Sequence, residues 1–268
     1  MTVIIGVLCS DGVVLGADGA ATFTAGNQRT IQQPTSKLHL IDTVAILGGT
    51  GSVGLGQRFA QVAHRALAQE RSKATHIDVG KAICAQAIAD AQQTGLQQID
   101  YGSLLAFEHR GEIHLCEFAY ANLQPEFKAA SLWYASIGSG QTIVDPFLGL
   151  LRNLFWADGL PTRRDASFAI TWALRHAINV CPGGLGDPIS LAELLLDGTG
   201  APVARMFSDD ELREHEANVV GLEDHIRAYP RIVTEGEQGA PDVPEPDDIS
   251  QGEEGTPPAT AAPQFGAP

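Results

Sequence analysis

One residue near the start of the chain combines two groups that nucleophilic catalysis needs. Thr2 follows the initiator methionine, and removal of that methionine would give Thr2 a free α-amine beside its own hydroxyl. An α-amine has a pKa of about 8, so it can act as the general base for the hydroxyl near neutral pH. Because many proteins begin with these two residue types, the interpretation depends on what surrounds Thr2.

Asp18 and Lys37 are the residues that could tune this nucleophile. Asp18 ends an apolar run at residues 13–17, and Lys37 precedes another at residues 38–41. A hairpin with its turn near residue 11 would bring Asp18 back to Thr2, and a lysine at the entry of the next strand could reach the same place. The Lys37 ammonium would lower the pKa of the Thr2 amine, and Asp18 would compensate and orient the lysine. An ordinary ion pair at two strand ends is the alternative.

A glycine-rich run suggests a different chemistry. Gly49, Gly51 and Gly54 fit the formal pattern G-x-G-x-x-G, and Glu70 stands where a ribose-binding acid would be expected. A dinucleotide-binding loop needs a parallel strand soon after its helix, within a unit of about 30 residues. A second helical segment follows the first one here, which disfavours a nucleotide site.

The apolar pattern predicts blocks of strands that alternate with pairs of helices. Strands are expected at residues 3–8, 13–17, 38–41, 44–47, 103–107, 113–118, 132–137 and 189–195. Helices are expected around residues 59–67, over 78–94 with Asp78 as the N-cap, and over 140–156 and 161–180. This order is not β-α-β-α, and it favours antiparallel sheets covered by helices.

Charge is unevenly spread along the chain. The 268 residues carry a net charge of −15, and from residue 232 onward there are eight acidic residues, no basic residue and seven of the fifteen prolines. We therefore expect one folded domain over residues 1–230 and a disordered, acidic, proline-rich tail over residues 231–268. An acidic chain without a basic patch argues against nucleic acid as a partner.

Composition also bears on location and on metal binding. No apolar run reaches the length of a membrane span and no basic-then-apolar leader precedes the first strand, so we expect a cytoplasmic protein without a membrane partner. His109, His114 and Cys116 lie close in sequence, but no second cluster completes a tetrahedral zinc site. We expect no metal and no cofactor. The four cysteines lack C-x-x-C spacing and are expected to be buried thiols: Cys9, Cys84, Cys116 and Cys181.

Several runs taken together resemble the β-subunit of the proteasome family. They are Thr2, residues 11–18, Ala21-Thr22, Lys37-Leu38, Gly48-Gly49-Thr50-Gly51 and the serine motif Ser136-Ile137-Gly138-Ser139-Gly140. The similarity covers about residues 2–200. It implies an α+β fold, a four-layer αββα sandwich of two antiparallel sheets between helix pairs, as in N-terminal nucleophile hydrolases.

The resemblance implies a role for each matching residue. Thr2 would be the nucleophile, Asp18 and Lys37 would tune it, and Ser139 would hydrogen-bond its amine and help relay the proton. The backbone amide of Gly49 would donate to the oxyanion. The backbone around the following residues would pair with an extended substrate: Ala21, Thr22, Gly49 and Gly51.

One position departs from the family pattern. The family has an Asp-x-x-Ser-Gly-Gly motif after its fourth helix, whereas this chain has Asn179 in place of the aspartate and Pro182 in place of the serine. Asparagine keeps a hydrogen-bond acceptor and loses the charge. The usual way of orienting the amine is therefore altered at Asn179.

The implied function is that of a self-compartmentalised threonine endopeptidase that cleaves unfolded proteins or peptides after Met1 removal. The resemblance further implies a homo-oligomer of stacked rings, in some relatives fed by an ATP-dependent unfoldase. The run from Gly54 to Phe59 and the acidic tail look most like the proteasome homologues of β-proteobacteria, with HslV-type proteases next. The alternatives are a catalytically weak or non-enzymatic ring subunit, and a small-amide hydrolase of the same fold.

Overall fold

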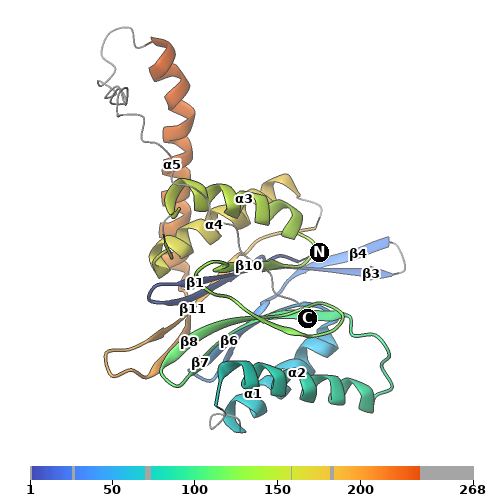
Figure 1. Cartoon of the computed structure of the whole chain (residues 1–268). Helices are drawn as coiled ribbons and strands as arrows, with labels where there is room; N and C mark the ends of the chain where they lie inside the picture. Colours follow the sequence, from blue (N-terminus) through green and yellow to red (C-terminus); the bar gives the residue numbers. More distant parts are fainter. Residues whose placement is uncertain (1, 26–27, 70–73, 158, 182–183, 236–268) are drawn as a thin grey trace, which may run out of the picture. The chain divides into compact units, whose positions relative to one another are not determined.

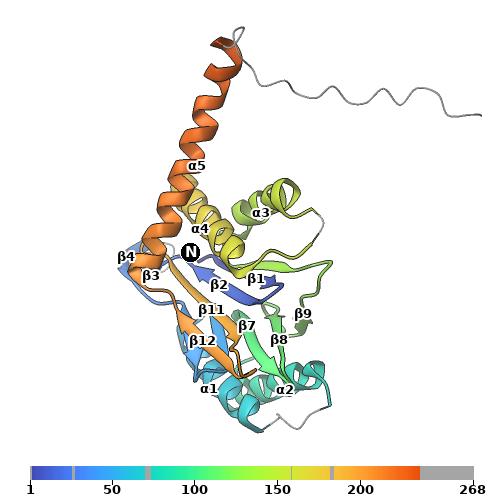
Figure 2. The ribbon, with the colours of Figure 1, turned by 90° about the vertical axis from the view of Figure 1, so that its left-hand side faces the viewer.

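Two antiparallel β-sheets lie face to face between two pairs of helices (Figure 1). The computed structural model describes residues 2–25, 28–69, 74–157, 159–181 and 184–235. Helices α1 (Val53–Gln69) and α2 (His76–Gln93) cover one sheet, and α3 (Gln141–Phe155) and α4 (Arg163–Val180) cover the other. A view turned by 90° shows the same layers (Figure 2).

The first sheet is built around the hairpin that follows Thr2. Strands β1 (Ile4–Cys9) and β2 (Gly12–Ala17) pair antiparallel through a tight turn at Ser10 and Asp11. Every residue of β2 is buried, because α4 packs on the sheet and the second sheet covers its other face. The strand order is β10-β1-β2-β11-β12, and the remaining strands are β10 (Tyr134–Ile137), β11 (Ser190–Leu196) and β12 (Pro202–Met206).

The second sheet carries the glycine-rich run at the end of one of its strands. Its order is β5-β6-β7-β8-β9, with every neighbouring pair antiparallel. A separate two-stranded sheet, β3 (Ala20–Ala25) with β4 (Gln28–Pro34), lies in sequence between Asp18 and Lys37. The strands of the second sheet are β5 (Leu38–Ile41), β6 (Ala45–Gly51), β7 (Tyr101–His109), β8 (Glu112–Phe118) and β9 (Pro125–Phe127).

Among the described residues, one apolar cluster lies between the two sheets and one lies under each pair of helices. Burial of a large aliphatic or aromatic side chain contributes about 1.5–3 kcal/mol. The cluster between the sheets includes Ile4, Leu15, Ile46, Leu104 and Leu115. The cluster under α1 and α2 includes Phe59, Val62, Ile83, Leu105 and Phe107. The cluster under α3 and α4 includes Val3, Ile5, Val144, Ile170 and Leu174.

Local sequence signals explain where the helices start and which face they bury. Within the helix predicted around residues 59–67, the apolar residues recur at helical spacing, and α1 buries all five of them: Phe59, Val62, Ala63, Ala66 and Leu67. Helix α4 begins with a capping box, in which Thr162 and Asp165 each accept a hydrogen bond from the other's backbone N–H. The prediction for α2 was wrong by one turn: Thr75 is the N-cap, and its side chain accepts from the N–H of Asp78.

The predicted fold class is confirmed, and the strand pairing excludes a dinucleotide-binding unit at the glycine-rich run. Strand β6 leads into α1, α2 follows, and the next strand, β7, pairs antiparallel with β6. A dinucleotide-binding unit requires a parallel pair at this point. The glycines of residues 48–56 therefore serve another purpose.

Some elements were not predicted from the sequence. They are β3, β4, the short strands β9 and β12, and the polar helix α5 (Asp209–Glu235). Residues 1–223 form one compact unit and a second unit begins at Asp224. Residues 231–235, which composition assigned to the tail, are helical, and residues 236–268 lie outside the described residues. Within the described part of the chain, no helix is both long and apolar enough to cross a membrane.

Candidate active site

Thr2 lies two residues before the start of β1, and the turn after β10 contacts its backbone. The backbone nitrogen of Thr2 donates a hydrogen bond to Ser139 Oγ at 3.1 Å, and the N–H of Gly140 donates to the Thr2 carbonyl at 3.1 Å. Because the chain includes Met1, this nitrogen is a peptide N–H, and it stands where the α-amine would lie once Met1 is removed. Ser139 thus presents an acceptor to the predicted amine.

The turn that carries Ser139 approaches Thr2 so closely that its glycines cannot carry side chains. Gly138 has a φ of +96°, and a Cβ there would stand 2.3 Å from the Thr2 carbonyl oxygen. A Cβ on Gly140 would stand 2.7 Å from the Cβ of Val3. The spacing of glycine, serine and glycine is therefore what lets the hydroxyl of Ser139 reach the Thr2 backbone.

Asp18 is fully buried and its carboxylate collects hydrogen bonds from four donors. Oδ1 accepts from Lys37 Nζ at 2.6 Å and from the N–H of Val3 at 2.8 Å. Oδ2 accepts from the N–H groups of Ala20 at 3.3 Å and Gly186 at 3.4 Å. The hairpin brings Asp18 to the residue after Thr2, as the sequence predicted, because the β1–β2 register pairs Ile4 with Ala17.

Lys37 is almost as deeply buried as its partner. Its side chain is 7% exposed and its pKa is lowered, because burial disfavours the charged ammonium more than the nearby Asp18 carboxylate favours it. Lys37 Nζ and the Val3 N–H donate to the same oxygen of Asp18, so the ammonium lies beside the Thr2–Val3 peptide. A cation in that place favours a neutral amine and an anionic hydroxyl at Thr2.

The end of β6 reaches the same corner of the molecule. The pairing of β5 with β6 begins at Leu38 and Gly48, so Gly49, Thr50 and Gly51 continue beyond the end of β5. A Cβ built on Gly138 would be 3.3 Å from Thr50 Oγ1, which places this strand end against the turn that holds Thr2. The predicted oxyanion donor and the predicted nucleophile therefore come from neighbouring segments.

At two positions of this strand end, Gly49 and Gly51, neighbouring atoms leave no room for a side chain. A Cβ on Gly49 would stand 2.3 Å from the hydroxyl of Tyr101, a buried residue of β7. Gly51 has a φ of +105°, and a Cβ there would stand 2.3 Å from the carbonyl oxygen of Asp100. Glycine is thus favoured at both positions. As a result, no side chain of residue 49 or 51 covers the backbone there.

Ala21 and Thr22, the predicted substrate-binding residues, lie on β3. Backbone pairing joins Ala21 to Gln33 and Thr22 to Gln32 of β4. Within the described residues β3 pairs with β4 alone, so its second edge is open to an extended chain. The strand starts two residues after Asp18, whose carboxylate accepts from the N–H of Ala20.

For Asn179, another predicted site residue, no contact with Thr2 is found among the described residues. It is exposed on the last turn of α4, and no hydrogen bond of its side chain is found among the described residues. Pro182 lies outside the described residues. Gly186, in the loop between α4 and β11, does contact the site, because its N–H donates a hydrogen bond to Asp18. Sequence reasoning missed Gly186, although the glycines at 183, 184 and 186 marked a close approach of backbone.

The residues considered for zinc lie elsewhere. The imidazole of His114 stacks on that of His76 with 4.0 Å between ring centroids, and burial together with His76 lowers the pKa of His114 to about 4. Cys116 is fully buried, and burial raises the pKa of its thiol. In the part of the chain that the structure describes, no group of three or more potential ligands could hold a metal ion.

Comparisons with known proteins agree with this architecture. A family model described as a proteasome subunit matches residues 2–178. The Gly-1 mutant of Anbu from Hyphomicrobium sp. strain MC1 superposes with a TM-score of 0.65 at 16% identity, covering 85% of this chain and 96% of that one. Anbu, described as an ancestral β-subunit, from Yersinia bercovieri superposes with a TM-score of 0.65 at 12% identity, covering 89% and 98%. No curated protein matches the chain.

Proposed function

Because the chain belongs to the proteasome subunit family, with its N-terminal nucleophile hydrolase fold, we propose that it is a threonine endopeptidase whose nucleophile is Thr2. One observation carries the proposal. A buried lysine–aspartate pair and a serine hydroxyl from three distant segments converge on the backbone of Thr2 and Val3. Buried ionisable groups with shifted pKa values, such as Lys37 here, cluster at functional sites, so this arrangement supports a catalytic role for Thr2.

The first chemical step is formation of the acyl-enzyme. Once Met1 is removed, the neutral amine of Thr2 accepts the proton of its own hydroxyl, directly or through a water molecule. Oγ then attacks the carbonyl carbon of a peptide bond, and Lys37, fixed by Asp18, stabilises the negative charge. The N–H of Gly49 donates to the oxyanion. The protonated amine, hydrogen-bonded to Ser139, gives its proton to the leaving nitrogen as the C–N bond breaks.

The second step releases the product and restores the enzyme. The amine accepts a proton from water, the hydroxide attacks the ester carbonyl, and the second tetrahedral intermediate uses the same oxyanion donor. Collapse of that intermediate returns the proton to Oγ of Thr2 and frees the new carboxyl end. No metal or cofactor takes part in this scheme.

The open edge of β3 supports an extended polypeptide as the substrate. A peptide that adds to Ala21 and Thr22 as a further strand would pass the end of β6 at Gly49 and Gly51. Members of this family form rings that stack. We propose that copies of this chain do the same, so that unfolded chains reach Thr2 inside a chamber and folded ones need an ATP-dependent unfoldase.

Asn179 supports one alternative, a catalytically weak ring subunit. The family aspartate at this place is replaced, and Asn179 is exposed on α4. A weak subunit would assemble and react slowly or not at all with a threonine-directed electrophile. A small-amide hydrolase of the same fold would react readily but would cleave a single small amide and leave unfolded protein intact.

Intact-mass measurement with and without a threonine-directed electrophile tests the proposal. We expect a mass that lacks Met1, one adduct per chain on Thr2, and cleavage of an unfolded peptide that disappears in Thr2→Ala while assembly survives. Thr199→Ala, at an exposed threonine of the β11–β12 turn, is the matched control and should behave like the wild type. Retained Met1 in active protein, or turnover by Thr2→Ala, would overturn the assignment.

A further inference from the structure

A carboxylate on α3 braces the turn that carries Ser139. Asp145 Oδ1 accepts a hydrogen bond from Ser136 Oγ at 2.5 Å, and Asp145 Oδ2 accepts one from Gln141 Nε2 at 3.0 Å. Ser136 is the second-last residue of β10 and Gln141 is the first residue of α3. The two oxygens of Asp145 therefore tie together the segments on either side of residues 137–140.

Strand and helix geometry aim both partners at Asp145. Side chains alternate along β10, so Ala135 and Ile137 enter the cluster between the sheets while Ser136 faces the α3 side. Gln141 and Asp145 are four residues apart on α3 and share one face of the helix. Ser136 is 2% exposed, so the donor side of its hydrogen bond to the half-buried Asp145 lies inside the protein.

The braced segment is the one that wraps around Thr2. The glycines at 138 and 140 stand against the backbone of Thr2 and Val3, and Ser139 Oγ accepts from the Thr2 nitrogen. Within this turn the N–H of Gln141 also donates to the Gly138 carbonyl at 3.2 Å. A shift of the turn would move Ser139 Oγ away from the Thr2 nitrogen. The hydrogen bonds of Asp145 do not involve β3, the strand proposed to bind the substrate.

We propose that Asp145 is a positioning residue for the peptidase reaction, acting on Thr2 through Ser136, Gln141 and the Ser139 turn. The inference rests on the proposed function. Asp145 does not contact the reacting atoms, so it acts on the rate of the chemical step and not on substrate binding. A displacement of about 1 Å in a catalytic group can cost about 100-fold in rate.

A double-mutant cycle with Ser139 separates positioning from mere support of the fold. In the full-length assembled protein, Asp145→Ala should lower kcat for an unfolded peptide by about 10-fold to 100-fold and leave KM within about twofold. Because Asp145 acts through Ser139, adding Asp145→Ala to Ser139→Ala should lower the rate by less than about twofold. The rate of covalent capture of Thr2 by an electrophile gives the same comparison where turnover is slow.

Milder variants guard against misfolding. Gln141→Ala removes one of the two bonds at an exposed residue and should lower kcat in the same direction by a smaller factor. Asp145→Asn should recover part of the loss, because an amide can accept from Ser136 and donate to a rotated Gln141. Ser208→Ala breaks a similar serine–carboxylate bond, to Glu211 at the start of α5, and should leave kcat unchanged.

Each outcome separates this inference from the proposed function. If Thr2→Ala abolishes turnover but Asp145→Ala costs the same factor with and without Ser139, the inference is wrong and the proposed function stands. A rise in KM that accounts for the whole effect of Asp145→Ala would also overturn it. If Thr2→Ala keeps its turnover, the proposed function itself is wrong.

Discussion

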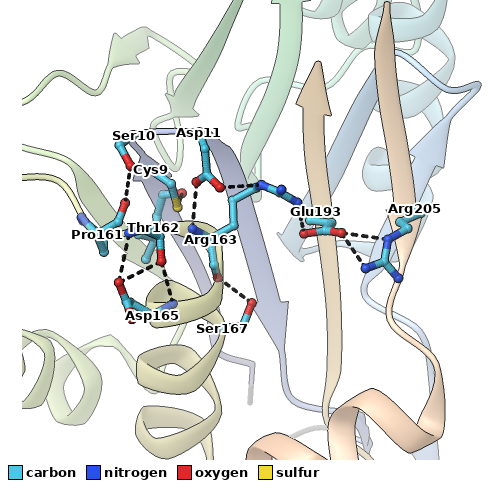
Figure 3. Close-up of polar contacts among 11 residues, drawn as sticks. Cys9, Ser10, Asp11, Pro161, Thr162, Arg163, Asp165, Ser167, Glu193 and Arg205 are labelled. Atoms are coloured by element: carbon cyan, nitrogen blue, oxygen red, sulfur yellow. Dashed lines mark hydrogen bonds and ion pairs between the residues drawn. The ribbon is translucent and has the colours of Figure 1, made fainter. Parts of the chain in front are cut away.

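The β1–β2 hairpin has a buried carboxylate near each of its ends, and the two carboxylates are neutralised in different ways. Asp18, just after β2, accepts from one ammonium and from backbone N–H groups. Glu193 on β11 lies opposite Val14 and faces two guanidinium groups, those of Arg163 and Arg205 (Figure 3). Both carboxylates are less than a tenth exposed.

The two ends differ most in how much water reaches the cations. Around Glu193, the Arg163 and Arg205 side chains are 24% and 42% exposed, and each also meets a second acid, Asp11 at 3.2 Å and Glu211 at 2.9 Å. Burial lowers the pKa of Arg205, but the hydrogen bonds and charges of Glu211 and Glu193 outweigh it, and the net shift is upward. At Lys37 the effect of burial exceeds the effect of the Asp18 charge, and the pKa of the ammonium is lowered.

This difference indicates two purposes for the same kind of ion pair. The network around Glu193 joins the hairpin turn, α4, β11, β12 and the start of α5, and its acids raise the pKa of Arg205. The pair at Lys37 holds a destabilised ammonium against the residue that follows Thr2. We therefore expect changes at the Lys37 end to affect the reaction and changes at the Glu193 end to affect stability.

Among variants at the two ends of the hairpin, Lys37→Met should give the largest effect on catalysis. Loss of the ammonium removes the group that favours the neutral amine and stabilises the alkoxide, so kcat should fall by at least about 100-fold. Peptide cleavage and covalent capture of Thr2 are the measurements. Lys128→Met is the matched control, because Lys128 is 4% exposed and pairs with Glu117 and Glu126 away from Thr2. Equal losses in the two variants would contradict the comparison.

Glu193→Ala should give the largest effect on stability. It removes the acid that Arg163 and Arg205 share. Because both guanidinium groups are partly exposed and each keeps a second acid, the free energy of unfolding should fall by about 1–2 kcal/mol, less than for a fully buried pair. Urea denaturation measures that loss, and kcat per folded molecule should equal that of the wild type. Glu214→Ala, at an exposed acid 4.0 Å from Arg164, should change stability by less than about 0.5 kcal/mol. A fall in kcat like that of Lys37→Met would erase the distinction between the two ends.

Glu211→Gln should give the smallest effect and a dependence on pH. Hydrogen bonds from Ser208 and the charge of Arg205 hold the pKa of Glu211 below its usual value of 4.5. The stabilisation is therefore present above pH 4.5 and is lost as pH falls through the lowered pKa. Because Glu211 is 37% exposed, the cost at pH 7 should be about 0.5 kcal/mol. Thermal unfolding of the wild type and of Glu211→Gln at several pH values measures this cost. A difference in stability between the two proteins that persists below the lowered pKa would contradict the prediction.

Much of the fold could be predicted because it depends on local patterns. The apolar runs on both sides of residues 10–11 specify a hairpin, and that hairpin places Asp18 beside Val3. The five apolar residues of α1 specify its buried face in the same way. Strands β3 and β4 lack such a pattern: β3 is mostly alanine and threonine, β4 is mostly polar, and they pair with each other instead of joining a large sheet.

The sequence by itself determined which residue types could carry the proposed reaction: a threonine, an aspartate, a lysine and a glycine-flanked serine. Tertiary structure decided which of the residues meet. Asp18 and Gly186 are joined across 168 residues, and Arg163 and Glu193 across 30. It also decided that Asn179 faces outward while Asp145 braces the Ser139 turn. Residue spacing cannot reveal such contacts, because they depend on how the two sheets and the helices that cover them pack. Packing also fixes how far each cation is buried. That burial is why the pKa of Lys37 is lowered while the pKa of Arg205 is raised.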